Sequence, residues 1–248
     1  FWLSVAGPAG FTAENYLRLY KNAAYLRIFE QTFGLSAAVT VAVVLLGYPV
    51  AYLIAQLPRK IAIPCLGLVL LPFWTSLLVR TFAWLVLLQR HGIVNDALTA
   101  LGLIGEPLAL LYNITGTLIG MVHIMLPFLI LPLYAVMRGI EPTLTRAAMS
   151  LGSSPTHAFW RIFLPLSLPG LVAGALLVFV YSLGFYIVPQ ILGGGRVNMV
   201  AMKVVDNATQ FGDWGAASAL GVVLLAVTLA FCLLIAALRR PDRAGARP

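Results

Sequence analysis

The sequence predicts an all-α integral membrane protein with five transmembrane helices in this chain, and three observations support that prediction. First, 61% of the 248 residues are hydrophobic and only 10% are charged, whereas an ordinary globular domain has about 25% charged residues. Second, several apolar stretches are long enough to cross a bilayer, which takes about 20 helical residues. Third, a polar, helix-prone segment at residues 141–170, with Arg146, His157 and Arg161, lies between two of those stretches.

The predicted elements alternate between polar connections and apolar spans. Residues 1–32 are mixed and polar, so we expect an external segment with a short helix near residues 13–20. Residues 33–240 form the transmembrane domain, within which residues 138–167 form a connection outside the lipid, and residues 241–248 form a short basic tail. By length and apolar character, the spans lie at about 33–56, 61–88, 108–137, 168–188 and 214–238.

Prolines inside the spans indicate a transport path rather than a plain membrane anchor. Pro64 and Pro72 are expected to break the second span, which also carries Arg80. A proline removes a backbone donor, and the freed carbonyl needs a partner in protein or in a water-filled cavity. Kinks that serve helix packing alone are the alternative. Close helix packing is expected at two GxxxG pairs, residues 116–120 and 170–174.

The distribution of basic residues predicts which side of the membrane each connection faces. If the tail is inside, the inside connections hold nine of the 16 Lys and Arg residues, and six of the eight acidic residues lie outside. Cytoplasmic connections are enriched in Lys and Arg, so the 138–167 connection and the C-terminus are expected in the cytoplasm. Because the chain then starts outside, we expect a sixth, N-terminal span that is missing from this chain.

Motifs for catalysis or metal binding are absent from the sequence. None of the three Lys residues follows a glycine-rich phosphate loop, and His91, His123 and His157 lack metal-ligand spacing. The basic residues are scattered, so no patch follows a nucleic acid backbone. We therefore expect no enzyme activity, no catalytic residue, no metal, no cofactor and no nucleic acid partner for this chain.

The polar connection carries a motif that points to a family. Ala147-Ala148, Gly152 and Leu164-Pro165 stand in an order and spacing that resemble the EAA motif of permease subunits in ABC importers. The resemblance implies the type I ABC importer permease fold, in which this connection forms a cytoplasmic coupling helix seated in a groove of the ATPase subunit. It assigns that contact to Arg146, Ala147, Ala148, Leu151, Gly152, Phe159 and Pro165.

The motif residues suit a short, rigid helix that transmits movement to the spans. Ala147 and Ala148 allow close approach, Gly152 permits a sharp exit, and Pro165 with Pro169 is expected to fix the turn back into the membrane. One position departs from the family pattern. The usual acidic residue is replaced here by Arg146, so the contact made by that carboxylate is lost or inverted.

Further stretches resemble the spermidine/putrescine-type branch of these permeases, and the resemblance covers nearly the whole chain from residue 10 to residue 238. It implies an importer in the bacterial inner membrane, surrounded by lipid. The expected partners are a second permease subunit, two ATP-binding subunits that hold MgATP, an external solute-binding protein and a small-molecule substrate. The stretches are LLGYPVAY at 45–52, LPFWTSLLVRT at 71–81, GMVH at 120–123, LPFLILPLY at 126–134 and LGGG at 192–195.

The cargo implied by this branch is a polyamine, spermidine or putrescine. Aromatic faces attract such cations, and aromatic residues are frequent in and beside the broken spans. No Asp or Glu lies within a predicted span, and Gln190 stands where polyamine members carry an acid. The expected pathway residues are Trp74, Arg80, Tyr181, Phe185, Tyr186, Gln190 and Asp206.

Two alternatives to a polyamine importer remain open. If Arg80 faces the pathway rather than the outer interface, an anionic or zwitterionic cargo is favoured, such as an opine, an amino-acid derivative or a phosphonate. A channel or secondary transporter that needs no ATPase would require intramembrane acids or an inverted repeat. The sequence shows neither feature.

Overall fold

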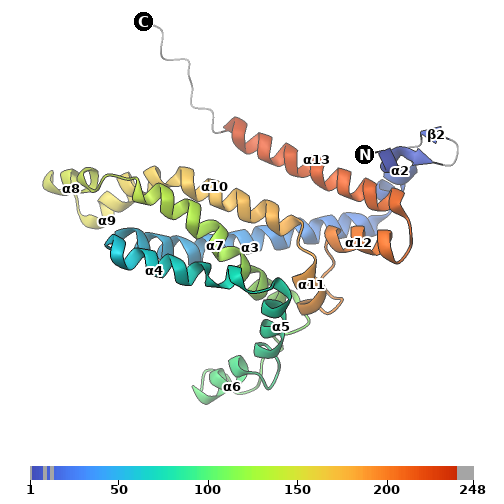
Figure 1. Cartoon of the computed structure of the whole chain (residues 1–248), viewed down its shortest axis with the longest axis horizontal. Helices are drawn as coiled ribbons and strands as arrows, with labels where there is room; N and C mark the ends of the chain where they lie inside the picture. The colour runs from blue at the N-terminus through green and yellow to red at the C-terminus, as the bar shows by residue number, and fades with distance from the viewer. Residues whose placement is uncertain (1, 8–9, 12–13, 239–248) are drawn as a thin grey trace, which may run out of the picture. The chain divides into compact units, whose positions relative to one another are not determined.

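The computed structural model describes residues 2–7, 10–11 and 14–238. Nearly all the elements in this part of the chain are helices (Figure 1), and the only strands described are β1 (Ala6–Gly7) and β2 (Gly10–Phe11), which pair antiparallel. The chain forms two compact units, one of Phe33–Val197 and one that joins the N-terminal residues up to Thr32 with the residues from Asn198 onward. The prediction of an all-α fold is confirmed.

The larger unit contains most of the helices. The first of them, α3 (Ala23–Gln56), begins in the N-terminal segment and continues into this unit. The remaining elements, in chain order, are α4 (Arg59–Leu70), η1 (Leu71–Trp74), α5 (Leu77–Leu87), α6 (Ile93–Ala100), α7 (Ile114–Arg138), α8 (Pro142–Ser150), α9 (Pro155–Ala158), η2 (Phe159–Phe163), α10 (Leu164–Leu183) and α11 (Ile187–Leu192).

The smaller unit is built around its last helix. It comprises α1 (Trp2–Val5), α2 (Glu14–Lys21), α12 (Val200–Thr209) and α13 (Trp214–Leu238), with α13 packed against the other three. Leu19, Val200, Ala219 and Leu220 form a buried apolar cluster. An ion pair between Arg18 and Asp213 (Nη1 to Oδ2, 3.2 Å) adds a contact between α2 and the segment just before α13.

The described chain has four or five apolar helical spans, where the sequence predicts five. Four helices of the described chain are long and apolar enough to cross a membrane: α3, α7, the continuous helix Pro155–Leu183, and α13 over Trp214–Leu233. The pair Arg59–Trp74 and Leu77–Leu87, which is bent by 95°, makes a fifth crossing if the two helices together form one broken span, and a re-entrant loop otherwise.

The predicted break in the second span lies at one position only. Pro64 is accommodated inside α4 without interrupting it. The chain leaves the helical conformation at Thr75 (φ −98°, ψ 144°) and Ser76 (φ −57°, ψ 140°), directly after the short 3₁₀ helix that begins with Leu71-Pro72. Two extended residues in succession redirect the chain, so the bend occurs there.

The fourth span differs from the prediction at both ends. The helix is continuous from Pro155 to Leu183, so the expectation that Pro165 turns the chain back into the membrane is wrong. Proline lacks an N–H and crowds the preceding turn. The π-helical turn η2 precedes it, with the Leu164 N–H bonded to the Phe159 carbonyl, and this wider turn accommodates the proline.

The first and third spans also begin at residues that the apolar pattern did not indicate. α3 begins at Ala23, ten residues before the predicted start at 33, because the Asn22 side chain accepts a hydrogen bond from the Ala24 N–H (3.0 Å). α7 begins at Ile114 rather than 108, because Asn113 caps it by accepting from the Gly116 N–H (2.9 Å).

Helix α7 is the centre of packing in the larger unit. α7 and α10 run side by side (Figure 1), and they are antiparallel, because Gly170 faces Val136 whereas Gly174 faces Leu129. A Cβ atom on Gly174 would lie 3.2 Å from the Leu129 backbone. The glycine therefore allows the two helices to approach closely, as the GxxxG spacing predicts.

Candidate functional site

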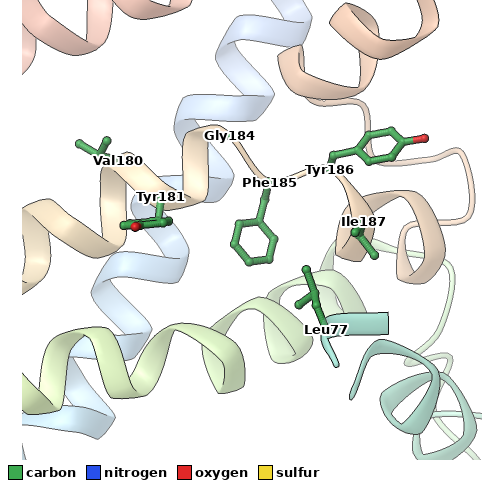
Figure 2. Close-up of a pocket in the computed structure, with 7 residues that line it drawn as sticks. All are labelled: Leu77, Val180, Tyr181, Gly184, Phe185, Tyr186 and Ile187. Carbon is green, nitrogen blue, oxygen red and sulfur yellow. The ribbon is translucent and has the colours of Figure 1, made fainter. Parts of the chain in front are cut away.

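A cavity of about 450 Å³ opens in the larger unit where α10 ends (Figure 2). One of its lining residues comes from the start of α5. The other six come from the end of α10, the linker that follows it and the first residue of α11. In Figure 2 the Phe185 side chain points toward Leu77, whereas Tyr186 extends away from Phe185. The lining residues are Leu77, Val180, Tyr181, Gly184, Phe185, Tyr186 and Ile187.

The cavity lies where α10 ends, five residues before the span end that the sequence predicts at residue 188. α10 ends at Leu183, Gly184 follows as its C-cap, and α11 begins only at Ile187. In a membrane, non-helical backbone is tolerated where it is buried in protein or lines a water-filled cavity. The linker of residues 184–186 therefore has the property expected of a pathway lining.

A series of aromatic rings extends from this cavity across three elements. The ring of Tyr181 in α10 lies 5.0 Å from that of Phe128 in α7, and Phe128 lies 5.1 Å from Phe73 in η1 (centroid to centroid). Tyr181 is also half exposed, at 51%. Of these three rings only Tyr181 lines the cavity, so the aromatic series continues beyond it.

The structure brings together three of the seven expected pathway residues. Tyr181, Phe185 and Tyr186 line the cavity, whereas Trp74, Arg80 and Gln190 do not. Asp206 lies on α12 in the smaller unit, where its carboxylate bonds to the Lys203 ammonium (3.1 Å). That carboxylate is already neutralised within its own helix.

Arg80 lies in a polar cluster on α5 and α7. The Trp84 indole N–H donates to Nδ1 of His123 (3.1 Å), and the two rings are 5.5 Å apart in an edge-to-face arrangement. Arg80 lies one turn before Trp84 in α5, and its Nε is buried without a hydrogen bond in the described part of the chain. Neither ion pair of the described residues involves Arg80.

The predicted coupling segment is a helix, a turn and the start of a second helix. α8 ends in a Schellman motif: the Ser153 N–H bonds to the Ala148 carbonyl (3.0 Å) and the Gly152 N–H to the Met149 carbonyl (3.0 Å). Gly152 has φ +89°, a conformation that glycine adopts without strain. This residue provides the sharp exit that its place in the motif predicts.

Helix α8 has an inner and an outer face. Pro142, Thr145, Arg146 and Met149, spaced three and four apart, line a second cavity of about 530 Å³. The opposite side exposes Leu144 and Ala147, and the turn after it exposes Leu151. The structure thus separates Arg146 from Ala147 and Leu151, with which the sequence motif grouped it.

One contact joins α7 to α3, and a second joins the coupling segment to α3. The Arg138 guanidinium at the end of α7 donates through Nη1 to the Ala55 carbonyl (2.9 Å) and the Leu57 carbonyl (3.1 Å), and so caps α3. The ring of Phe159 packs edge-to-face on Tyr52 at 5.3 Å. Phe159 therefore contacts α3 from within the predicted coupling segment, whereas Pro165 is exposed on α10.

Comparison with known proteins agrees with this architecture. The model of the family described as "binding-protein-dependent transport system inner membrane component" matches residues 47–240. The chain belongs to this family. It is therefore a membrane-embedded transport subunit of the inner membrane, as the sequence motif predicts.

The relatives and structural neighbours of this transport subunit are importer proteins. It is 33% identical to the spermidine/putrescine transport system permease protein PotB of Escherichia coli over 227 residues, which is 91% of this chain and 81% of the relative. A bacterial ABC transporter involved in the import of the acidic polysaccharide alginate matches with a TM-score of 0.74 at 18% identity, over 98% of this chain and 88% of that chain. The fold is that of type I ABC importer permeases.

A second neighbour of the transport subunit is the bacterial alginate ABC transporter in complex with an alginate pentasaccharide-bound periplasmic protein. It matches with a TM-score of 0.71 at 19% identity, over 93% of this chain and 83% of that chain. In that structure the transporter contacts a solute-binding protein.

Sequence reasoning missed two functional features of this transport subunit. The break at residues 184–186 was signalled only by Gly184 within an otherwise apolar run. The cap from Arg138 to α3 joins residues 83 positions apart, and no local pattern indicates such a contact.

Proposed function

We propose that the chain is the transmembrane permease subunit of an ATP-driven importer that moves a polyamine, spermidine or putrescine, by alternating access. The observation that carries the proposal is the 33% identity to a spermidine/putrescine permease over 91% of the chain. In this proposal the C-terminus is cytoplasmic, and ATP is hydrolysed with Mg²⁺ in separate subunits.

The lining of the cavity at the end of α10 supports a cationic cargo. Tyr181 and Phe185 present aromatic surface to it, and none of the residues that line it is charged. An ammonium group over an aromatic face gains about 0.5–1 kcal/mol at an exposed site and about 2 kcal/mol when desolvated. Two such rings select a flexible diamine over a neutral solute of similar size.

The partners in this proposal are a second permease subunit, two ATP-binding subunits and an external solute-binding protein. A periplasmic protein bound to the alginate transporter supports the last of these. The outer face of α8 supports an ATPase contact, because Leu144 is 46% and Leu151 is 90% exposed on a segment outside the spans.

In this mechanism the closing ATPase pair pushes on the outer face of α8. The Phe159–Tyr52 contact passes the displacement to α3, and the Arg138 cap, which joins α3 to α7, passes it on to α7. Because α10 packs closely along α7 and ends at the cavity, movement of this helix pair changes the width of the pathway.

A second candidate cargo is an anionic or zwitterionic solute, such as an opine, an amino-acid derivative or a phosphonate. The observation that favours it is Arg80, whose Nε is buried without a hydrogen bond in the described part of the chain. A carboxylate or phosphonate group would satisfy that donor.

The test uses the importer reconstituted in proteoliposomes with its ATPase, second permease and binding protein. We expect ATP-dependent uptake of radiolabelled spermidine and no uptake of an aminophosphonate. Phe185→Leu, which keeps the apolar bulk but loses the ring face, should raise KM about 3- to 30-fold, whereas Phe185→Tyr should stay near wild type. Saturable uptake of the phosphonate, with spermidine inert, would establish the second candidate instead.

A further inference from the structure

The cavity beneath α8 is separate from the pathway cavity and has a different chemistry. Its volume is about 530 Å³, and it lies between α8, the end of α3 and the end of α7. No residue lines both cavities. The transport mechanism assigns no ligand to it.

The charged groups in this cavity are two guanidinium groups. Nη1 of Arg138 already donates to the Ala55 and Leu57 carbonyls, which leaves its other N–H groups for an anion. Arg138 and Arg146 line it together with Gln56 and Thr145, and none of its lining residues is acidic. Both ion pairs in the described part of the chain lie in the other unit, so neither guanidinium is neutralised by a carboxylate there. Arginine forks match the geometry of phosphate oxygens.

The rest of the cavity is apolar, so it favours a lipid, which has an apolar part, over a free anion. Ile140, Met149 and Phe159, which are partly or fully exposed, contribute apolar surface beside the arginines. A hydrated inorganic phosphate gains nothing from such a surface. The glycerol and first acyl carbons of a phospholipid gain hydrophobic contact there.

The position of the cavity also suits a lipid. It lies at the ends of two membrane-spanning helices, α3 and α7, where headgroups meet protein. On the proposed orientation this is the cytoplasmic side, where basic pockets between spans bind acidic headgroups.

We propose that this cavity binds the phosphate group of an anionic phospholipid, held between Arg138 and Arg146, with its glycerol region against Ile140 and Phe159. The bound lipid joins α8 to α3 and α7, so membrane charge sets how firmly the coupling segment is held. Arg146, in place of the acid usual in the EAA motif, supplies one of the two charges. The inference rests on the proposed orientation but not on the identity of the cargo.

The test measures lipid binding to the assembled importer in detergent by native mass spectrometry, after delipidation and titration with phosphatidylglycerol. We expect Arg146→Gln to weaken binding about fivefold, the value of one basic side chain near an anionic lipid. Arg146→Lys should bind nearly as wild type. The matched control is Arg161→Gln, since Arg161 is exposed on η2 in the same connection but does not line the cavity.

Three outcomes would overturn the proposal. Equal loss in Arg146→Gln and Arg161→Gln would mean that lipid responds only to overall charge. Displacement of phosphatidylglycerol by millimolar inorganic phosphate would make this a site for a soluble anion. Binding to the permease alone, but not to the importer with its ATPase, would assign the cavity to the ATPase contact. None of these outcomes depends on spermidine uptake.

Discussion

Replacing Arg138 is expected to loosen the end of α3 without affecting the transport cavity. The guanidinium lies at the end of α7 and donates to two carbonyls of the α3 terminus, Ala55 (2.9 Å) and Leu57 (3.1 Å). These carbonyls lie where a helix has no intrahelical donors left. Arg138→Met keeps the length and apolar stem of the side chain but removes both hydrogen bonds and the charge.

The expected magnitude follows from these two contacts. Hydrogen bonds from a charged donor contribute about 1.5–3 kcal/mol each when buried, and a cation at a helix C-terminus adds about 0.3–1 kcal/mol. The lower ends of these ranges add to about 3 kcal/mol. Because Arg138 is exposed, solvent screening reduces the expected loss to about 2 kcal/mol. For a chain of this size that corresponds to a fall in Tm of about 4–8 °C.

The assay has a global and a local readout. Thermal unfolding in detergent, followed by tryptophan fluorescence, gives Tm, and hydrogen–deuterium exchange of residues 53–58 reports opening of the α3 end. Arg161→Met removes an exposed arginine from the same connection and should leave both unchanged. If Arg138→Met and Arg161→Met show the same Tm and the same exchange over residues 53–58, the capping argument is wrong.

Two further predictions concern glycines. Gly174→Val should destabilise the α7–α10 pair by about 1–3 kcal/mol, because even a Cβ atom at this position would lie 2.9 Å from the Leu129 side chain. The measurement is Tm, which should fall. The control is Gly221→Val, because a Cβ atom at Gly221 meets nothing within 4 Å. Gly152→Ala has free space around its Cβ but must hold φ +89°, at a cost of about 1–2 kcal/mol. It should raise the number of ATP molecules hydrolysed per solute while solute binding is preserved, and an unchanged ratio in Gly152→Ala and in the control Gly67→Ala would exclude a coupling role for this turn.

Local sequence signals predict a helix end well where the conformation depends only on neighbouring residues. Gly152 was recognisable because a helix that ends in a Schellman motif needs a left-handed residue there, and the structure gives it that conformation. The prediction that Pro165 turns the chain back into the membrane also came from a local signal, and it is wrong. A proline after a polar segment usually marks a helix boundary, but the π-helical turn η2 accommodates it within a continuous helix.

Both cavities depended on contacts that the sequence does not display. The pathway cavity combines Leu77 of α5 with Tyr181 of α10, and the cavity beneath α8 combines Tyr52, Arg138 and Arg146. Aromatic enrichment singled out Tyr181 and Phe185, which line the first cavity, but the same reasoning included Trp74, which is 81% exposed and lines neither cavity. Composition identifies suitable residue types and not the direction in which each side chain points.

The sequence by itself determined that this chain is a bundle of membrane-spanning helices with a polar segment between two of them. Apolar length and local hydrogen bonding are sufficient for that result, because each helix satisfies its own backbone. The tertiary structure alone decided which face of each helix meets its neighbour. That choice depends on close packing such as Gly174 against Leu129, which fixes how α7 and α10 are rotated and therefore which side chains reach the cavities.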